Sequence, residues 1–369
     1  MSKSLVTVVI PAFNASRTIA ATLDSVVAQT YDNLEILVVD DGSTDLTAEI
    51  VLTYRDRDPR ITLIKQANGG VAAARNTGIK AAHGNYIAPI DADDIWHPTK
   101  IDKQMAVMLA GGPEMGLVYS PCRIIDTNGG VLRTSPLYGC QGWVFCQHLY
   151  INFVGNGSSL LFRKTVALEM GGYDSRLRAW GAEGCEDSLF QSRIAARYRF
   201  GCAPEYLIGY RHLPERMSSN AERMFNSHKF ALQLIRAECL EVPQFVYDWA
   251  LARRKLEITP KLIHNRELHD ALELILYSLR HDSLSTLLKF FFYGPRKGKR
   301  ALESLTQHLV EKDLNQIQRR PFYGFDPTEG RHGNYAYIVK SRLKQLAKLD
   351  RELAKIKGYQ TEDRKLANF

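Results

Sequence analysis

The chain has 369 residues, of which 45% are hydrophobic and 24% charged, and its formal net charge at pH 7 is +8. This is the composition of an ordinary globular protein with a full hydrophobic core, and the length suggests two domains. The six cysteines lack CxxC spacing, which argues against a zinc site and a dense disulfide framework. No apolar run reaches about 18 residues, so we expect no signal peptide, no membrane span and a cytoplasmic location.

Strand and helix patterns alternate through the first part of the chain. Short β-branched apolar runs predict strands over 5–10, 34–39, 60–65 and 85–90. Helices are expected between them, from Asn14 or Ser16 to about Gln29, from Thr44 or Asp45 to about Tyr54, and over 72–83. This alternation predicts an α/β fold with a mostly parallel sheet between helices, in which ligands bind at the carboxyl ends of the strands.

The pattern changes further along the chain. We expect a helix over 100–110, strands over 117–120 and 158–162, helices from Lys164 and over 186–198, and irregular structure over 121–150. Beyond residue 225 long amphipathic helical patterns take over, at 226–240, 245–256, 266–280, 299–311 and 338–356. We therefore divide the chain into an α/β domain, residues 1–225, and an α-helical domain, residues 226–369.

The positive charge belongs to the helical part alone. Residues 1–225 carry a net charge of −1 and residues 226–369 a net charge of +9. Within residues 289–300 an aromatic run is followed by a basic run, which indicates either a lipid interface or the end of a core helix followed by a solvated basic loop. A basic region of this kind attracts nucleic acid, anionic lipid or an acidic glycan; the alternatives are a solvated helical face and an oligomer contact.

Three carboxylates stand within four residues directly after the strand predicted over 85–90. They are Asp91, Asp93 and Asp94, with Ala92 among them. Such carboxylates repel one another unless a cation or hydrogen-bond donors neutralise them, and oxygen ligands of this kind suit Mg²⁺ or Mn²⁺ bound with help from a substrate phosphate. The alternative is an acidic cap for a helix beginning near Ile95, but the end of a buried strand favours a metal site.

Polar or aromatic groups also follow the first two predicted strands. Asp40 and Asp41 end the second strand, where a carboxylate can accept hydrogen bonds from a uracil N3–H or from ribose hydroxyls. The alternative is a simple turn from strand to helix. Pro11 and Phe13 end the first strand, and Phe13 is either a platform for a nucleotide base or a core aromatic.

Two further motifs lie beside predicted helix starts. Gly69 and Gly70 allow close backbone approach, and Arg75 follows in the first turns of a helix, where it can meet an anion or a base. The spacing is not the GxGxxG fingerprint of dinucleotide-binding proteins. Glu186 and Asp187 begin a later helix, where a carboxylate acts either as a general base or as a helix cap.

Taken in order, these motifs resemble glycosyltransferase family 2, whose fold is called GT-A. The resemblance is carried by residues 6–45, 68–98, 171–195 and 210–218, and it covers about residues 5–220. It implies that Phe13, after Pro11, stacks on the nucleotide base. It also implies that Asp41, with Asp40 beside it, holds that base and that Arg75 contacts the nucleotide.

The resemblance further implies a DxD pair of Asp91 and Asp93, the first nearer the ribose and the second on the metal and the diphosphate. Asp187, in the pair with Glu186, would be the catalytic base, and the donor would be a UDP-sugar or a dTDP-sugar, with UDP favoured. One cation and one positioned carboxylate suffice for a single displacement. Because no second carboxylate stands out as a nucleophile, we predict inversion.

The chain departs from the family pattern at two places. Relatives often carry a histidine one position after His212, where this chain has Leu213, so His212 is either a metal ligand or a hydrogen-bonded loop residue. The residues after Gln191 do not match the QxxRW box of the processive synthases. We therefore expect transfer of one sugar or a few.

The sequence thus predicts an inverting glycosyltransferase, dependent on Mn²⁺ or Mg²⁺, that moves a hexose or N-acetylhexosamine from a UDP-sugar to a glycan or lipid-linked acceptor. Its pathway would be synthesis of a surface polysaccharide or glycoconjugate. We expect a peripheral contact with the inner face of the plasma membrane or a homo-oligomer contact through residues 226–369, and no nucleic-acid partner.

Two other functions remain open from the sequence. One is a sugar nucleotidyltransferase, which would need a glycine-rich basic triphosphate loop that the segment after the first strand lacks. The other is a nucleotide-sugar-binding module without transfer activity, against which the intact Asp91, Asp93 and Asp187 speak.

Overall fold

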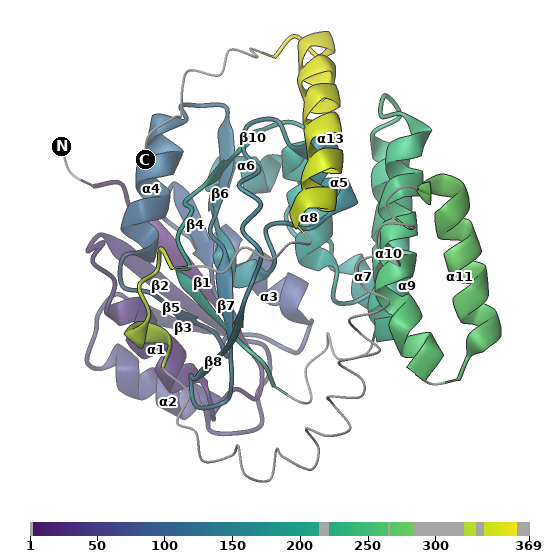
Figure 1. The fold of residues 1–369 in the computed structure, drawn as a ribbon. Coiled ribbons are helices and arrows are strands. Elements are labelled where there is room, and N and C mark those ends of the chain that lie inside the picture. The colour runs from purple at the N-terminus through teal and green to yellow at the C-terminus, as the bar shows by residue number, and fades with distance from the viewer. Residues whose placement is uncertain are drawn as a thin grey trace.

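Two sheets form the frame of the first part of the molecule (Figure 1). The structure is a computed structural model that describes residues 3–213, 221–264, 266–283, 286, 321–329 and 336–359. The larger sheet has the strand order β10-β6-β9-β4-β1-β2-β3, and the smaller has the order β5-β11-β7-β8. The strands of the larger sheet are β1 (Val6–Ala12), β2 (Leu34–Asp40), β3 (Ile61–Lys65), β4 (Tyr86–Pro89), β6 (Met115–Tyr119), β9 (Leu160–Arg163) and β10 (Arg199–Cys202).

The larger sheet is mostly parallel, which confirms the predicted fold class. Strands β1 to β4 pair in parallel, as do β6 and β10, whereas β9 runs antiparallel to both β4 and β6. Strand β1 is buried along its whole length. Its side chains alternate between two hydrophobic clusters, with Val8 and Ile10 in one and Val9 in the other. Both faces of this sheet are therefore covered, as a continuous apolar strand requires.

One group of helices covers each face. Helices α1 (Ile19–Val27), α2 (Thr47–Arg55) and α4 (Lys100–Ala110) contribute to the cluster that holds Val8. The cluster around Val9 draws on α3 (Val71–Ala81), α5 (Phe145–Tyr150), α6 (Lys164–Glu169) and α8 (Glu186–Ala195).

Helices α1 and α2 begin later than predicted, at Ile19 and Thr47. The polar residues that we expected to cap them bond to each other's loops instead. Asn14 Oδ1 accepts the N–H of Thr44 at 2.8 Å, and Asp45 Oδ2 accepts the N–H of Ser16 at 3.0 Å. These bonds tie the loop after β1 to the loop after β2.

The prediction of irregular structure over 121–150 is wrong. That region contains β7 (Cys122–Ile125), β8 (Val131–Thr134) and α5. Strand β7 pairs in parallel with β11 (Ile208–Arg211), and β11 pairs antiparallel with β5 (Ile95–Trp96). Partners so distant in sequence stabilise strands that local patterns do not indicate, and β10 was missed for the same reason.

The C-terminal helices pack directly on the α/β part. They are α9 (Ala221–Glu238), α10 (Gln244–His264), α11 (Leu268–His281) and α13 (Ala336–Ile356). Helix α9 contacts α8, while α10 and α13 contact α5 (Figure 1). Ile235, Val246 and Leu343 belong to the same buried cluster as Val9. The predicted helix over 299–311 and the aromatic and basic runs in 289–300 lie outside the described residues.

Residues 321–329 lie on the other side of the molecule, beside β5 (Figure 1). Buried Arg123 of β7 donates hydrogen bonds to the carbonyls of Asp326 at 2.6 Å and Glu329 at 2.7 Å. Phe322 is buried there, and the Tyr323 hydroxyl donates to the Trp96 carbonyl at 3.3 Å. The C-terminal third therefore contacts both the helical face and the smaller sheet.

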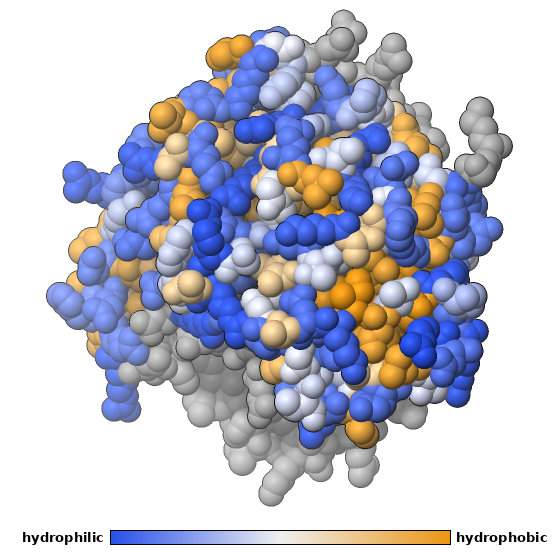
Figure 2. Space-filling view, turned by 180° about the vertical axis from the view of Figure 1, so that it is seen from behind, coloured by the Kyte–Doolittle hydropathy of each residue, from blue (hydrophilic) through white to orange (hydrophobic). Residues whose placement is uncertain are grey.

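The surface seen from behind is mainly hydrophilic, with hydrophobic side chains scattered across it and gathered in one area (Figure 2). Among the described residues, we find no helix with both the length and the apolar character needed to cross a bilayer.

Asp350 fixes α13 to α5. Its buried carboxylate accepts the main-chain N–H groups of Cys146 at 2.6 Å and Gln147 at 3.3 Å, and the Gln147 side-chain amide at 3.1 Å. The first N–H groups of a helix have no acceptor within that helix. In α5 the acceptor for these groups is Asp350, some 200 positions away in sequence.

We predict that Asp350→Ala lowers the free energy of unfolding by about 3 kcal/mol, because it leaves buried donors without their charged acceptor. Urea denaturation measures the change. Glu352→Ala, which removes an exposed carboxylate from the same helix, should change stability by less than about 0.5 kcal/mol. Equal effects of the two substitutions would contradict this account of Asp350.

Candidate active site

One arginine joins two of the carboxylates that the sequence singled out. Arg75 Nη2 lies 2.5 Å from Asp91 Oδ1, and Arg75 Nη1 lies 2.6 Å from Asp187 Oδ1. The guanidinium is buried and lies over the Tyr173 ring at 5.0 Å. Burial alone would lower the pKa of Arg75, but Asp187 and Asp91 raise it well above its ordinary value. The end of β4 and the starts of α3 and α8 therefore meet around a permanent positive charge.

Asp187 is partly exposed beside Arg75, and its pKa is raised. A quarter of its side chain is exposed (25%), so a ligand can reach it. Burial raises the pKa of Asp187 to about 7, against the opposing effect of the Arg75 guanidinium. A carboxylate with this pKa can accept a proton near neutral pH.

Glu186, the neighbour of Asp187, has other contacts. Its buried carboxylate accepts the N–H of Gly184 at 2.8 Å, within the turn that leads into α8. Burial raises the pKa of Glu186 as well. This geometry matches the capping alternative for Glu186 and leaves Asp187 as the carboxylate that faces Arg75.

The side chain of Asp94, the last residue of the loop 91–94, holds this loop in place. Asp94 is fully buried; its Oδ1 accepts the N–H of Arg211 at 2.9 Å and its Oδ2 accepts the Ser158 hydroxyl at 2.5 Å. The Ser158 oxygen accepts the N–H of Asp91 at 2.9 Å in turn. Burial, then Asp93 and Asp91, raise the pKa of Asp94 well above its ordinary value. Asp94 thus supports the loop. The sequence predicted neither this role of Asp94 nor the contacts of Ser158 with the loop.

Asp91 and Asp93, which are partly exposed, are the carboxylates of this loop that a cation could reach. The helix-capping alternative for the loop is wrong, because Ile95 begins β5 and the next helix, α4, starts at Lys100. Within the described residues no three His, Cys, Asp or Glu side chains gather into a metal-binding group. One or two carboxylates completed by substrate phosphates are what a Mg²⁺ site commonly uses, and the two side chains fit that scheme.

His212 follows directly on β11, whose last residue, Arg211, donates from Nε to the Asp93 carbonyl at 2.7 Å. The His212 side chain is exposed, and the main-chain N–H of His212 donates to the Ile125 carbonyl at 2.8 Å. The backbone thus brings His212 to the loop that carries Asp93. Its task as a metal ligand stays a prediction.

Asp41 holds the loop before α3. Its Oδ1 accepts the Gln66 side-chain amide at 2.6 Å and the Gly69 N–H at 2.8 Å, and its Oδ2 accepts the Gly70 N–H at 2.7 Å. Gly70 has φ +86°, and a Cβ there would lie 3.1 Å from Arg178 Cδ. Asp41 therefore sets the start of the helix that carries Arg75, whether or not it also contacts a base.

The remaining predicted residues lie at the ends of β1, β2 and β4. Phe13 is 52% exposed, so the core-aromatic alternative is wrong and its ring is available to a flat ligand. Asp40 is buried and accepts the Ser43 N–H at 3.0 Å, which is the turn predicted as its alternative. Pro11 and Ala92 are buried, so any contact that they make with a ligand runs through their main chain.

Gly157 is a site residue that the sequence did not reveal. A Cβ at this position would lie 2.5 Å from Arg75 Nη2 and 3.0 Å from Asp187 Oδ2, too close for any side chain. Its backbone packs against the arginine bridge, and nothing in the local sequence pattern marks it. Only the position directly before Ser158 connects it to the predicted strand.

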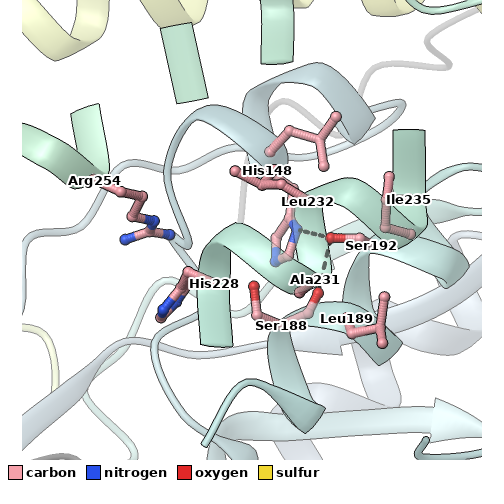
Figure 3. Close-up of a pocket in the computed structure, with 10 residues that line it drawn as sticks. His148, Ser188, Leu189, Ser192, His228, Ala231, Leu232, Ile235 and Arg254 are labelled. Atoms are coloured by element: carbon pink, nitrogen blue, oxygen red, sulfur yellow. Dashed lines mark hydrogen bonds between the residues drawn. The ribbon is translucent and has the colours of Figure 1, made fainter. Parts of the chain in front are cut away.

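A cavity lies elsewhere, between α5, α8, α9 and α10 (Figure 3). It has a volume of about 20 Å³, room for about one water molecule and not for a sugar nucleotide. His148 bonds to Ser192 Oγ at 3.1 Å, and burial lowers the pKa of both His148 and His228 to about 4. The cavity is therefore lined by neutral histidines and is part of the packing between the two regions.

Comparison with known proteins finds similarity to glycosyltransferases in the N-terminal part of the chain. The family model described as "Glycosyl transferase family 2" matches residues 7–158. The glycosyltransferase GlyA of Streptococcus pneumoniae is 46% identical over 24% of this chain and 13% of its own length. WfgD of Escherichia coli, named a UDP-Glc:alpha-D-GlcNAc-diphosphoundecaprenol beta-1,3-glucosyltransferase, is 40% identical over 35% of this chain and 49% of its own length. The chain thus spans less than half of these curated relatives.

Solved structures show the same fold. Residues 1–349 of TarS from S. aureus, in complex with UDP-GlcNAc, match with a TM-score of 0.56 and 21% identity, over 79% of this chain and 87% of that one. A mannosyltransferase from Pyrobaculum calidifontis, in complex with GDP-Man and Mn²⁺, matches with a TM-score of 0.56 and 19% identity, over 86% and 88%. Over residues 7–158 this chain is therefore similar to glycosyl transferase family 2, and the chain has the GT-A fold.

Proposed function

We propose that this protein transfers a sugar from a UDP-sugar to a hydroxyl of a glycan or lipid-linked acceptor, with inversion and with a divalent cation. The observation that carries the proposal is the Arg75 bridge, in which the two Nη atoms of one guanidinium hold Asp91 and Asp187. A donor-side carboxylate and a candidate base are thereby fixed at one place, at the carboxyl end of β4. The family of residues 7–158 supports the same reaction class.

The chemistry divides between the two carboxylates. Asp187 would take the proton from the acceptor hydroxyl as the hydroxyl oxygen attacks the donor sugar. Arg75 would keep the Asp187 carboxylate in place. Asp91 and Asp93 would hold Mn²⁺ or Mg²⁺, and the cation would stabilise the charge of the leaving diphosphate. Phe13, exposed beside the end of β1, would stack on the uracil.

The donor and the acceptor are proposed from the relatives. The name of WfgD gives a UDP-sugar donor and a diphosphoundecaprenol-linked acceptor for that protein, and TarS was solved with UDP-GlcNAc. Transfer to a similar lipid-linked sugar would place this chain in surface polysaccharide or glycoconjugate synthesis, on the cytoplasmic side of the membrane.

The proposal predicts that UDP binds at least tenfold more tightly with Mn²⁺ than with EDTA, because the cation joins the loop of Asp93 to the diphosphate. Isothermal titration calorimetry measures both affinities. Asp93→Asn should remove most of the gain, while Asp56→Asn, an exposed carboxylate on the end of α2, should not. Equal UDP affinity with and without the cation would refute metal dependence.

The proposal also predicts separate effects on binding and on chemistry. Asp187→Asn should lower the hydrolysis of UDP-glucose and UDP-GlcNAc, in which water replaces the acceptor, about 10²–10⁴-fold. The dissociation constant of UDP should stay within about threefold. Glu186→Gln is the matched control and should keep at least a tenth of the activity, because that carboxylate serves the turn at Gly184. Parallel loss of UDP binding in Asp187→Asn would show that Asp187 is not the base.

The raised pKa of Asp187 predicts the pH dependence. A base works in its deprotonated form, so kcat/KM for hydrolysis should rise about tenfold per pH unit up to about pH 7 and level off above it. Initial rates between pH 5 and 9 test this. A profile that is flat from pH 5 to 8 in the unaltered protein would be incompatible with the assignment.

A further inference from the structure

The basic residues of α13 divide into two sets. Seven lysines and arginines lie in α13 or directly after it, and two of them have carboxylate partners. Arg342 Nη2 lies 2.7 Å from Asp282 Oδ1, and Lys357 Nζ lies 2.5 Å from Glu241 Oε1. The other five are exposed, and within the described residues none of them forms an ion pair. These five, called the basic row below, are Lys340, Lys344, Lys348, Arg351 and Lys355.

The basic row occupies one side of the helix. Its members follow one another at intervals of four, four, three and four residues, which at 3.6 residues per turn keeps them on one stripe about 22 Å long. Neighbours in the row are like charges one turn apart, and such pairs destabilise a helix. The exposed side of α13 therefore carries a row of like charges whose repulsion destabilises the helix when no anionic partner is bound.

The helix presents this row on a fixed support. Asp350 anchors α13 to the start of α5, and Tyr359, just beyond the helix, stacks on Trp143 with ring centroids 4.6 Å apart. The side chains of Val339, Leu343 and Leu346, on the inner face of α13, are buried. Helix α13 packs on α5 and in Figure 1 stands between the α/β part and α10, with its upper end at the top of the molecule. An extended row of charges on one packed helix suits an extended partner rather than a small ion.

We propose that the basic row docks on an anionic lipid bilayer. Four of its five members are lysines, which meet phospholipid headgroups as mobile point charges. Ile356, which follows the row, is 78% exposed and can enter the boundary between headgroups and acyl chains. Between Lys340 and Lys355 the helix carries no aromatic side chain on which nucleic-acid bases could stack, so a bilayer is favoured over RNA.

Vesicle sedimentation with the full chain tests the proposal independently of the proposed enzymatic activity. At 0.1 M NaCl the protein should bind vesicles of 30% phosphatidylglycerol in phosphatidylcholine, and it should not bind pure phosphatidylcholine vesicles. Each cation near such a surface strengthens binding about fivefold, so Lys340→Gln, Lys344→Gln and Lys348→Gln together should weaken the partition about 100-fold. The thermal midpoint of this triple variant should not fall, since repulsion within the row is relieved.

A matched triple variant separates the row from net charge. Lys80→Gln, Arg133→Gln and Lys229→Gln remove three exposed cations from α3, β8 and α9 and should weaken the partition less than fivefold. Equal binding to both kinds of vesicle, or equal losses in the two triple variants, would overturn the proposal. It would also be overturned if the row variant lost affinity for a single-stranded RNA oligonucleotide but kept its partition to vesicles.

Discussion

A buried guanidinium between two carboxylates is the contact on which the arrangement of the candidate active site depends. Arg75 meets Asp91 from the end of β4 and Asp187 from the start of α8. A buried ion pair adds little net stability, but loss of one partner leaves an uncompensated charge and costs about 3–5 kcal/mol. The bridge therefore fixes geometry more than it stabilises the fold. Asp41 sets the helix start behind Arg75, and Gly157 leaves room for the bridge.

Much of the sheet and several site residues could be predicted because the information is local. Strand β1 is an almost wholly apolar run that contains Pro11 and is followed by Phe13, and β4 ends two residues before Asp91. The periodicity of apolar residues gives such strands, and the rule that ligands bind at their carboxyl ends gives the site. No local pattern, however, shows that Arg75 and Asp187, 112 residues apart, are in contact. The short strands β7, β8 and β11 depend on distant partners in the same way.

Local capping rules failed where tertiary contacts competed for the same polar groups. Asn14, Ser16 and Asp45 bind across two loops, so α1 and α2 start further along the chain. The change of composition near residue 225 does mark a change from strands to helices. It does not mark a gap in the core, because Ile235 and Leu343 share a buried cluster with Val9. Helix α8, which begins with the candidate base, is thus supported by α9 from the C-terminal part.

The most direct test of this account is Arg75→Lys, with UDP affinity and the rate of UDP-sugar hydrolysis measured on the same folded protein. Lysine keeps the positive charge but has no planar fork with which to hold Asp91 and Asp187 together. The account predicts that UDP affinity in the presence of Mn²⁺ and kcat both fall, each at least tenfold. Loss of UDP affinity with unchanged kcat would show that Arg75 is only a nucleotide contact and would contradict the account.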